Sequence, residues 1–126
     1  MTALWLALAG GLGAAARFLL DTVIARHNRL STPIGTIVVN VTACMLLGLL
    51  TGWAVGDPAR GDLKTILGVG FLGGYSTFST ASVEGARLVV QGRRWTALGH
   101  AGSMLVLSIL GSSLGLYLGG IAQQSW

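Results

Sequence analysis

A run of ten residues near the middle of the chain combines residue types that seldom occur together inside an apolar segment. Its sequence is Gly73-Gly74-Tyr75-Ser76-Thr77-Phe78-Ser79-Thr80-Ala81-Ser82. Glycines and hydroxyl residues hold a regular helix poorly, because glycine loses much backbone entropy and hydroxyls compete for backbone hydrogen bonds. Irregular backbone at membrane depth is tolerated only where protein buries it or where it lines a watery cavity. We therefore expect the functional region of the chain in residues 73–82.

The composition is that of an integral membrane protein. Of the 126 residues, 52% are hydrophobic and only 10% are charged, and the mean hydropathy is +0.72. A soluble domain carries about 25% charged residues. The net charge of +4 comes mostly from bases at the ends of apolar runs, where they orient a membrane protein. The charge therefore indicates a lipid bilayer, and not nucleic acid, as the partner.

Four apolar segments predict a single all-α domain over residues 1–126 with four membrane-spanning helices. A span needs roughly 20 apolar residues, and we place the spans at residues 3–24, 33–55, 63–90 and 95–121. The third span is long for one crossing, which favours a helix broken in mid-membrane. The tryptophans fall near span ends, as in an aromatic belt: Trp5, Trp53, Trp95 and Trp126.

Charged residues inside the spans have structural and functional interpretations. Arg17 precedes Asp21 by one helical turn, which predicts a pair at the membrane interface. Alternatively, Arg17 holds the architecture together or adds positive potential for an anion. Glu84 and Arg87 lie three residues apart on one helix face, which predicts an interfacial ion pair. The functional alternative there is a buried Glu84 that carries protons.

Uncharged polar residues occur in the second and fourth spans. Asn40 lies deep in an apolar segment, and an amide without partners is costly there. The residue is therefore either part of an interhelical hydrogen bond or a donor that lines a pore. Ser108 and Ser112 share a helix face and form a polar track in the functional interpretation, although serines in membrane helices most often bond their own backbone.

Glycines repeat every fourth residue in the second and fourth spans, which predicts close helix contacts. Because four short helices enclose a polar pathway poorly, we expect these glycine faces to support at least a dimer. The loop charges favour both termini outside and the first and third connections in the cytoplasm. The glycines are Gly48, Gly52 and Gly56, and Gly111, Gly115 and Gly119.

Three blocks of sequence resemble the signatures of one family, in the same order. Residues 10–17 read Gly-Gly-Leu-Gly-Ala-Ala-Ala-Arg, residues 33–40 read Pro-Ile-Gly-Thr-Ile-Val-Val-Asn, and residues 70–80 read Gly-Phe-Leu-Gly-Gly-Tyr-Ser-Thr-Phe-Ser-Thr. The chain thereby resembles the Fluc (CrcB) fluoride-channel family of small four-helix membrane proteins. The resemblance covers all four predicted spans, and its third block is highly specific.

The resemblance implies a fluoride-selective channel in the cell membrane of a prokaryote, through which cytoplasmic fluoride leaves by passive electrodiffusion and becomes less toxic. It implies a dual-topology dimer of antiparallel subunits with two fluoride pathways. The backbone carbonyls of Gly73 and Ser76 would hold a structural sodium ion, together with their equivalents in the partner. The implied pathway residues are Asn40, Phe78, Thr80, Ser108 and Ser112.

Two positions depart from the family pattern. Ala81 replaces a second pore phenylalanine, and Met104 stands where a polar residue often occurs. Both departures raise an alternative, in which the chain is a pore-degenerate subunit that pairs with a paralogue in a heterodimeric channel. The moderate bias of the loop charges agrees with a subunit of fixed orientation.

Two other classes of function fit the sequence less well. A small multidrug-type proton-coupled exporter is also a four-helix dimer, but it needs a carboxylate deep in the first span, where the chain has only Asp21 near the end. An enzyme is not predicted, because the serines of residues 73–82 have no histidine base. His27 lies in a loop, and His100 has no evident partner in the sequence.

Overall fold

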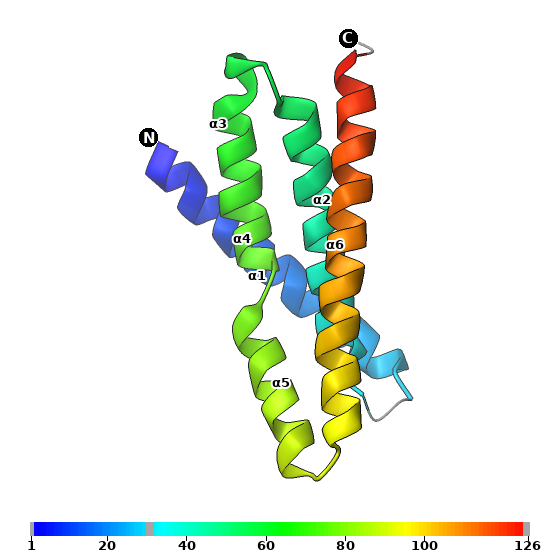
Figure 1. Cartoon of the computed structure of the whole chain (residues 1–126). Coiled ribbons are helices and arrows are strands. Elements are labelled where there is room, and N and C mark those ends of the chain that lie inside the picture. The colour runs from blue at the N-terminus through cyan, green and yellow to red at the C-terminus, as the bar shows by residue number, and fades with distance from the viewer. Residues whose placement is uncertain (1, 30–31, 125–126) are drawn as a thin grey trace.

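A computed structural model describes residues 2–29 and 32–124, and every regular element in this part of the chain is helical (Figure 1). Three helices are continuous: α1 (Thr2–His27), α2 (Ile34–Ala54) and α6 (Arg94–Gln124). Within the described residues, these three are long and apolar enough to cross a membrane. The prediction of an all-α membrane protein is confirmed. Trp126, which the aromatic belt includes, lies outside the described residues.

The segment between α2 and α6 is helical but interrupted. It contains the short turn η1 (Pro58–Arg60), α3 (Gly61–Lys64), the π-helical stretch η2 (Thr65–Leu72), α4 (Gly73–Tyr75) and α5 (Phe78–Val90). Between α4 and α5, Ser76 has a ψ of 160° and Thr77 has a φ of −149°, so both residues are extended. Figure 1 shows this connection between α4 and α5, after which α5 runs beside the first half of α6.

Helices α2 and α6 lie side by side (Figure 1) because glycines let their backbones touch. Each of Gly48, Gly52, Gly115 and Gly119 faces the other helix, where an added Cβ would overlap a main-chain carbonyl. The expectation that these glycine faces serve a second subunit is therefore wrong, since the chain uses them internally. The dimer itself stays a prediction and needs other support.

Helix α1 crosses behind α4 and α2 (Figure 1) and is also held by glycines. A Cβ on Gly13 would overlap the carbonyl of Phe71, and a Cβ on Gly74 would overlap that of Gly10. The Tyr75 hydroxyl lies 2.9 Å from Thr42 Oγ1 on α2. These contacts fix α4 against two helices just before the interruption. The buried core beside it consists of Val39, Ala43, Leu72 and Tyr75.

Candidate functional site

Asn40 on α2 pairs with both peptide groups of Thr77 in the interruption. The Thr77 N–H donates to Asn40 Oδ1 at 2.8 Å, and Asn40 Nδ2 donates to the Thr77 carbonyl at 2.8 Å. Because Thr77 is extended, its N–H has no helical acceptor, and a buried peptide group without a partner costs about 1–3 kcal/mol. The Asn40 amide therefore stabilises the interruption. Of the two roles predicted for Asn40, the structure shows the interhelical hydrogen bond.

Thr77 also caps the start of α5. Its Oγ1 accepts the backbone N–H of Thr80 at 3.2 Å and donates to Thr80 Oγ1 at 3.0 Å. An extended threonine before a helix is a favoured N-cap, because its side-chain oxygen satisfies an N–H group that the first turn leaves open. Helix α5 therefore restarts at a fixed point, and Phe78 is its first residue.

The same hydrogen bonds divert donors from the carbonyls of Gly73 and Ser76. In a continuous α-helix, the N–H groups of residues 77 and 80 would donate to these two carbonyls. Here they donate to the side chains of Asn40 and Thr77. Carbonyl oxygens suit a hard cation, which prefers oxygen ligands but needs more than two of them. Gly73 is exposed on the chain, so a second molecule has access to complete such a site.

A groove of about 350 Å³ opens on the α6 side of the interruption. Three of the predicted pathway residues, Asn40, Phe78 and Ser108, line this groove together with Ser76 and Met104. The side chain of Phe78 stands out from the chain, since the residue is 85% exposed. The fold thus brings an amide, a hydroxyl and an aromatic ring from three different helices to one open surface.

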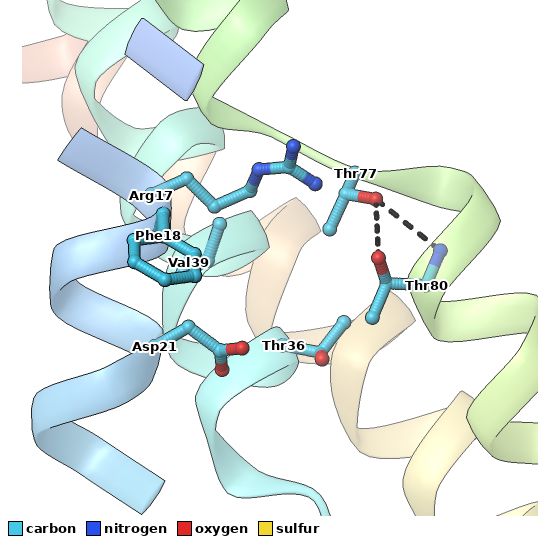
Figure 2. A pocket seen from close by; sticks show the side chains of 7 residues that line it. All are labelled: Arg17, Phe18, Asp21, Thr36, Val39, Thr77 and Thr80. Carbon is cyan, nitrogen blue, oxygen red and sulfur yellow. Dashed lines mark hydrogen bonds between the residues drawn. The ribbon is translucent and has the colours of Figure 1, made fainter. Parts of the chain in front are cut away.

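Thr80 lines a different cavity, of about 180 Å³, on the α1 side of the interruption. Figure 2 shows Arg17 reaching across this cavity toward Thr77, while Asp21 lies farther along α1. Arg17 Nε is buried without a hydrogen-bond partner, and the described residues show no ion pair between Arg17 and Asp21. The predicted pair is therefore wrong. The Asp21 carboxylate packs on Gly35, where an added Cβ would overlap it.

Ser112 does not line either cavity. Its Oγ donates to the carbonyl of Ile109 in the same helix at 3.0 Å, which is the arrangement common for serines in membrane helices. Ser108, one turn earlier, is the member of this pair that reaches the groove. The inclusion of Ser112 in a fluoride pathway stays a prediction.

The predicted pair of Glu84 and Arg87 is wrong, because Glu84 faces α6 instead. Glu84 Oε2 lies 3.8 Å from His100 Nε2, and the His100 side chain is only 1% exposed. Both ring nitrogens of His100 and Glu84 Oε2 are buried without hydrogen-bond partners. Glu84 lies six residues before the end of α5, and His100 lies six residues after the start of α6. Their equal distance from the turn between the two helices is the pattern in the sequence that indicates this contact.

The fold and the site define a class of protein: a multi-pass helical membrane protein whose polar side chains converge on an interrupted helix. The sequence profile of the family described as "CrcB-like protein, Camphor Resistance (CrcB)" matches residues 4–120. The chain therefore belongs to the CrcB family, as the three sequence blocks indicate.

Curated proteins from several bacteria are similar to the chain along almost its whole length. "Fluoride-specific ion channel FluC 2" of Cutibacterium acnes is 50% identical over 121 residues, which cover 94% of this chain and 98% of that protein. "Fluoride-specific ion channel FluC 1" of Leifsonia xyli subsp. xyli is 45% identical over 122 residues, with coverages of 97% and 89%. "Fluoride-specific ion channel FluC" of Novosphingobium aromaticivorans is 41% identical over 115 residues, with coverages of 89% and 90%. These names describe ion channels and not enzymes.

Proposed function

We propose that the chain is a subunit of a fluoride-selective channel through which fluoride leaves the cytoplasm passively, so that fluoride toxicity is reduced. The names of the relatives support the ion and the class of transport. One structural observation carries the proposal for this chain. The two hydrogen bonds between the Asn40 amide and the backbone of Thr77, the clamp, hold the helix open. They set exposed Phe78 and Ser108 in one groove.

The chemistry of the groove suits a small, strongly hydrated anion. A dry apolar pore would exclude fluoride, whereas hydroxyls, amide hydrogens and the positive edges of aromatic rings replace its water piece by piece. Phe78 supplies a ring and Ser108 a hydroxyl at the groove. On the other side of the interruption, Arg17, whose Nε is buried without a hydrogen-bond partner, adds positive potential beside Thr80, which raises the local concentration of anions.

The proposed assembly is an antiparallel dimer with a sodium ion at its centre. The carbonyls of Gly73 and Ser76 would hold the ion together with the same groups of the second subunit, because their helical donors are diverted to other acceptors. A bound sodium ion supplies a fixed positive charge that ties the two interruptions together. The second subunit is either identical or paralogous; Ala81 and Met104 support a paralogous partner with a more complete pathway.

The proposed topology has four crossings in the cell membrane of a prokaryote, with the segment 61–90 as the third. Figure 1 supports an even number of crossings, because both termini lie at one end of the bundle and the connections α1–α2 and α5–α6 lie at the other. The interruption at Ser76 and Thr77 lies between these ends, which agrees with a break in mid-membrane.

Fluoride efflux from liposomes that contain only the purified chain tests the function. The proposal predicts fluoride efflux that needs no proton gradient and greatly exceeds chloride efflux. If fluoride leaves only after a paralogous subunit from the same organism is added, the second subunit is paralogous. Uptake of an organic cation driven by a pH gradient, with no fluoride efflux in either preparation, contradicts the proposal and favours the exporter.

A further inference from the structure

The Asn40 amide has one hydrogen-bond donor that the clamp on Thr77 does not use. The amide nitrogen carries two hydrogens, and the amide oxygen accepts. The oxygen accepts from the Thr77 N–H, and one N–H donates to the Thr77 carbonyl, both at 2.8 Å. The nitrogen also donates to Met104 Sδ at 3.3 Å. Met104 therefore covers the second N–H of Asn40, on the side of the residue that faces the groove.

A thioether sulfur is a weak acceptor, and it is held here by a flexible side chain. Methionine is unbranched and adapts to irregular spaces. Met104 lines both the groove of Asn40 and an adjoining apolar groove of about 550 Å³ between α5 and α6. Ala81 and Ser82 are small residues in the lining of that second groove. The sulfur thus has space to leave Asn40 without any movement of the backbone.

We propose that Met104 is a displaceable cap on the pathway. Its sulfur accepts the second N–H of Asn40 until that N–H donates to fluoride instead, and the thioether then moves into the groove beside Ala81. This inference rests on the proposed fluoride pathway. Because every anion must displace the same sulfur, the cost of displacement is equal for all anions, and the cap lowers the affinity of Asn40 for each of them by the same factor. The preference for fluoride comes from the Asn40 N–H itself, since fluoride accepts hydrogen bonds more strongly than chloride does. Met104 sets the fluoride concentration at which that N–H becomes occupied.

The chain offers a direct probe of the cap, since it contains only two asparagines, Asn28 and Asn40. Labelling of the asparagine amide nitrogens with ¹⁵N gives two side-chain NH₂ groups to follow by NMR in detergent micelles during a fluoride titration. Asn28 donates to the Thr32 carbonyl at 2.8 Å, near the end of the bundle, and serves as the internal reference. This readout measures the anion at Asn40 whether or not the lone chain conducts.

Two substitutions of Met104 move the fluoride midpoint in opposite directions. Met104→Leu keeps the volume but removes the acceptor, so the midpoint of the Asn40 shift falls by about threefold, as expected for the loss of a weak hydrogen bond. Met104→Gln places a stronger acceptor on the same N–H and raises the midpoint. Met45→Leu is the matched control, since Met45 lies on α2 and lines neither groove, and it leaves the midpoint unchanged.

The results of these titrations and of the efflux assay distinguish a failure of the Met104 cap from a failure of the proposed function. Equal midpoints for the natural chain, Met104→Leu and Met104→Gln overturn the cap, even if fluoride efflux from liposomes is normal. An Asn40 signal that responds to fluoride in none of the three removes both the cap and the place of Asn40 in the pathway. Loss of selective fluoride efflux from the natural chain, alone and with its paralogue, refutes the proposed function itself.

Discussion

Two glycine-rich regions of the molecule have opposite effects on the backbone. Between α2 and α6, the glycines allow two unbroken helices to touch, and main-chain atoms of one helix fill the space of the missing side chains. At residues 73–77, glycines are followed by hydroxyl residues, and the helix opens. The difference lies in the side chains that accompany the glycines, because Asn40 and Thr77 supply the hydrogen bonds that an open backbone needs.

The largest effect is expected at Asn40. Asn40→Leu leaves the N–H of Thr77 without a partner and removes a second hydrogen bond to the Thr77 carbonyl. The free energy of unfolding therefore falls by about 3 kcal/mol, and fluoride efflux is lost. Asn40→Asp keeps the acceptor for the Thr77 N–H and should lie between Leu and the natural residue. Denaturant unfolding in detergent measures the order. A Leu variant as stable as the natural chain would show that the interruption does not depend on Asn40.

Two neighbouring glycines of α6 test the other region. A Cβ on Gly119 would overlap the carbonyl of Leu49 on α2, whereas a Cβ on Gly120 meets nothing within 4 Å. Gly119→Ala should therefore lower the free energy of unfolding by about 1–3 kcal/mol. Gly120→Ala should leave it equal or raise it by up to about 1 kcal/mol, because alanine favours a helix. The same loss in both variants would contradict a contact that is specific to one helix face.

Phe78 separates function from stability. The residue is 85% exposed on the chain, so Phe78→Ala should change the free energy of unfolding by less than about 0.5 kcal/mol. Its ring faces the proposed pathway, and removal of a ring that contacts the anion should slow fluoride efflux about tenfold, as a loss of about 1.4 kcal/mol predicts. Efflux assays and unfolding of the same preparation give both values. Unchanged efflux would remove Phe78 from the pathway.

The smallest effect concerns the contact between α5 and α6. A double-mutant cycle of Glu84→Ala and His100→Ala should show a coupling of about 0.5–1 kcal/mol, because the two side chains are near neighbours. The comparison cycle of Glu84→Ala and Arg87→Ala should show a smaller coupling, because these two residues lie on one helix face but Glu84 contacts His100 instead. Coupling in the second cycle and none in the first would restore the ion pair that the sequence predicts.

The sequence predicts the helices better than it predicts their contacts. Hydropathy identifies α1, α2 and α6, and the cluster of glycines and hydroxyls marks the place where Ser76 and Thr77 leave the helix. The pairing of polar side chains does not follow from spacing within one helix. Arg17 and Asp21 lie one turn apart, yet Asp21 packs on Gly35 and Arg17 points toward the interruption. Likewise, Glu84 faces His100 across a turn.

The predicted pathway residues divide according to the helix faces on which they lie. Asn40, Phe78 and Ser108 reach one groove, whereas Thr80 points into the Arg17 cavity. Which face of α5 meets which neighbour is decided by the turn that the backbone takes at Thr77, and this turn depends on a hydrogen bond to a residue 37 positions away. A distant contact of this kind leaves no periodic pattern in the sequence.

Fluoride efflux from liposomes that contain either the natural chain or Asn40→Asp shows whether passage of the ion depends on the hydrogen bonds between Asn40 and Thr77. We expect selective fluoride efflux through the natural chain, alone or with its paralogue. Efflux should be at least about tenfold slower through Asn40→Asp, whose added negative charge repels the anion and whose side chain has no N–H. Equal fluoride efflux through the two proteins, or none through the natural chain in either setting, would contradict this dependence.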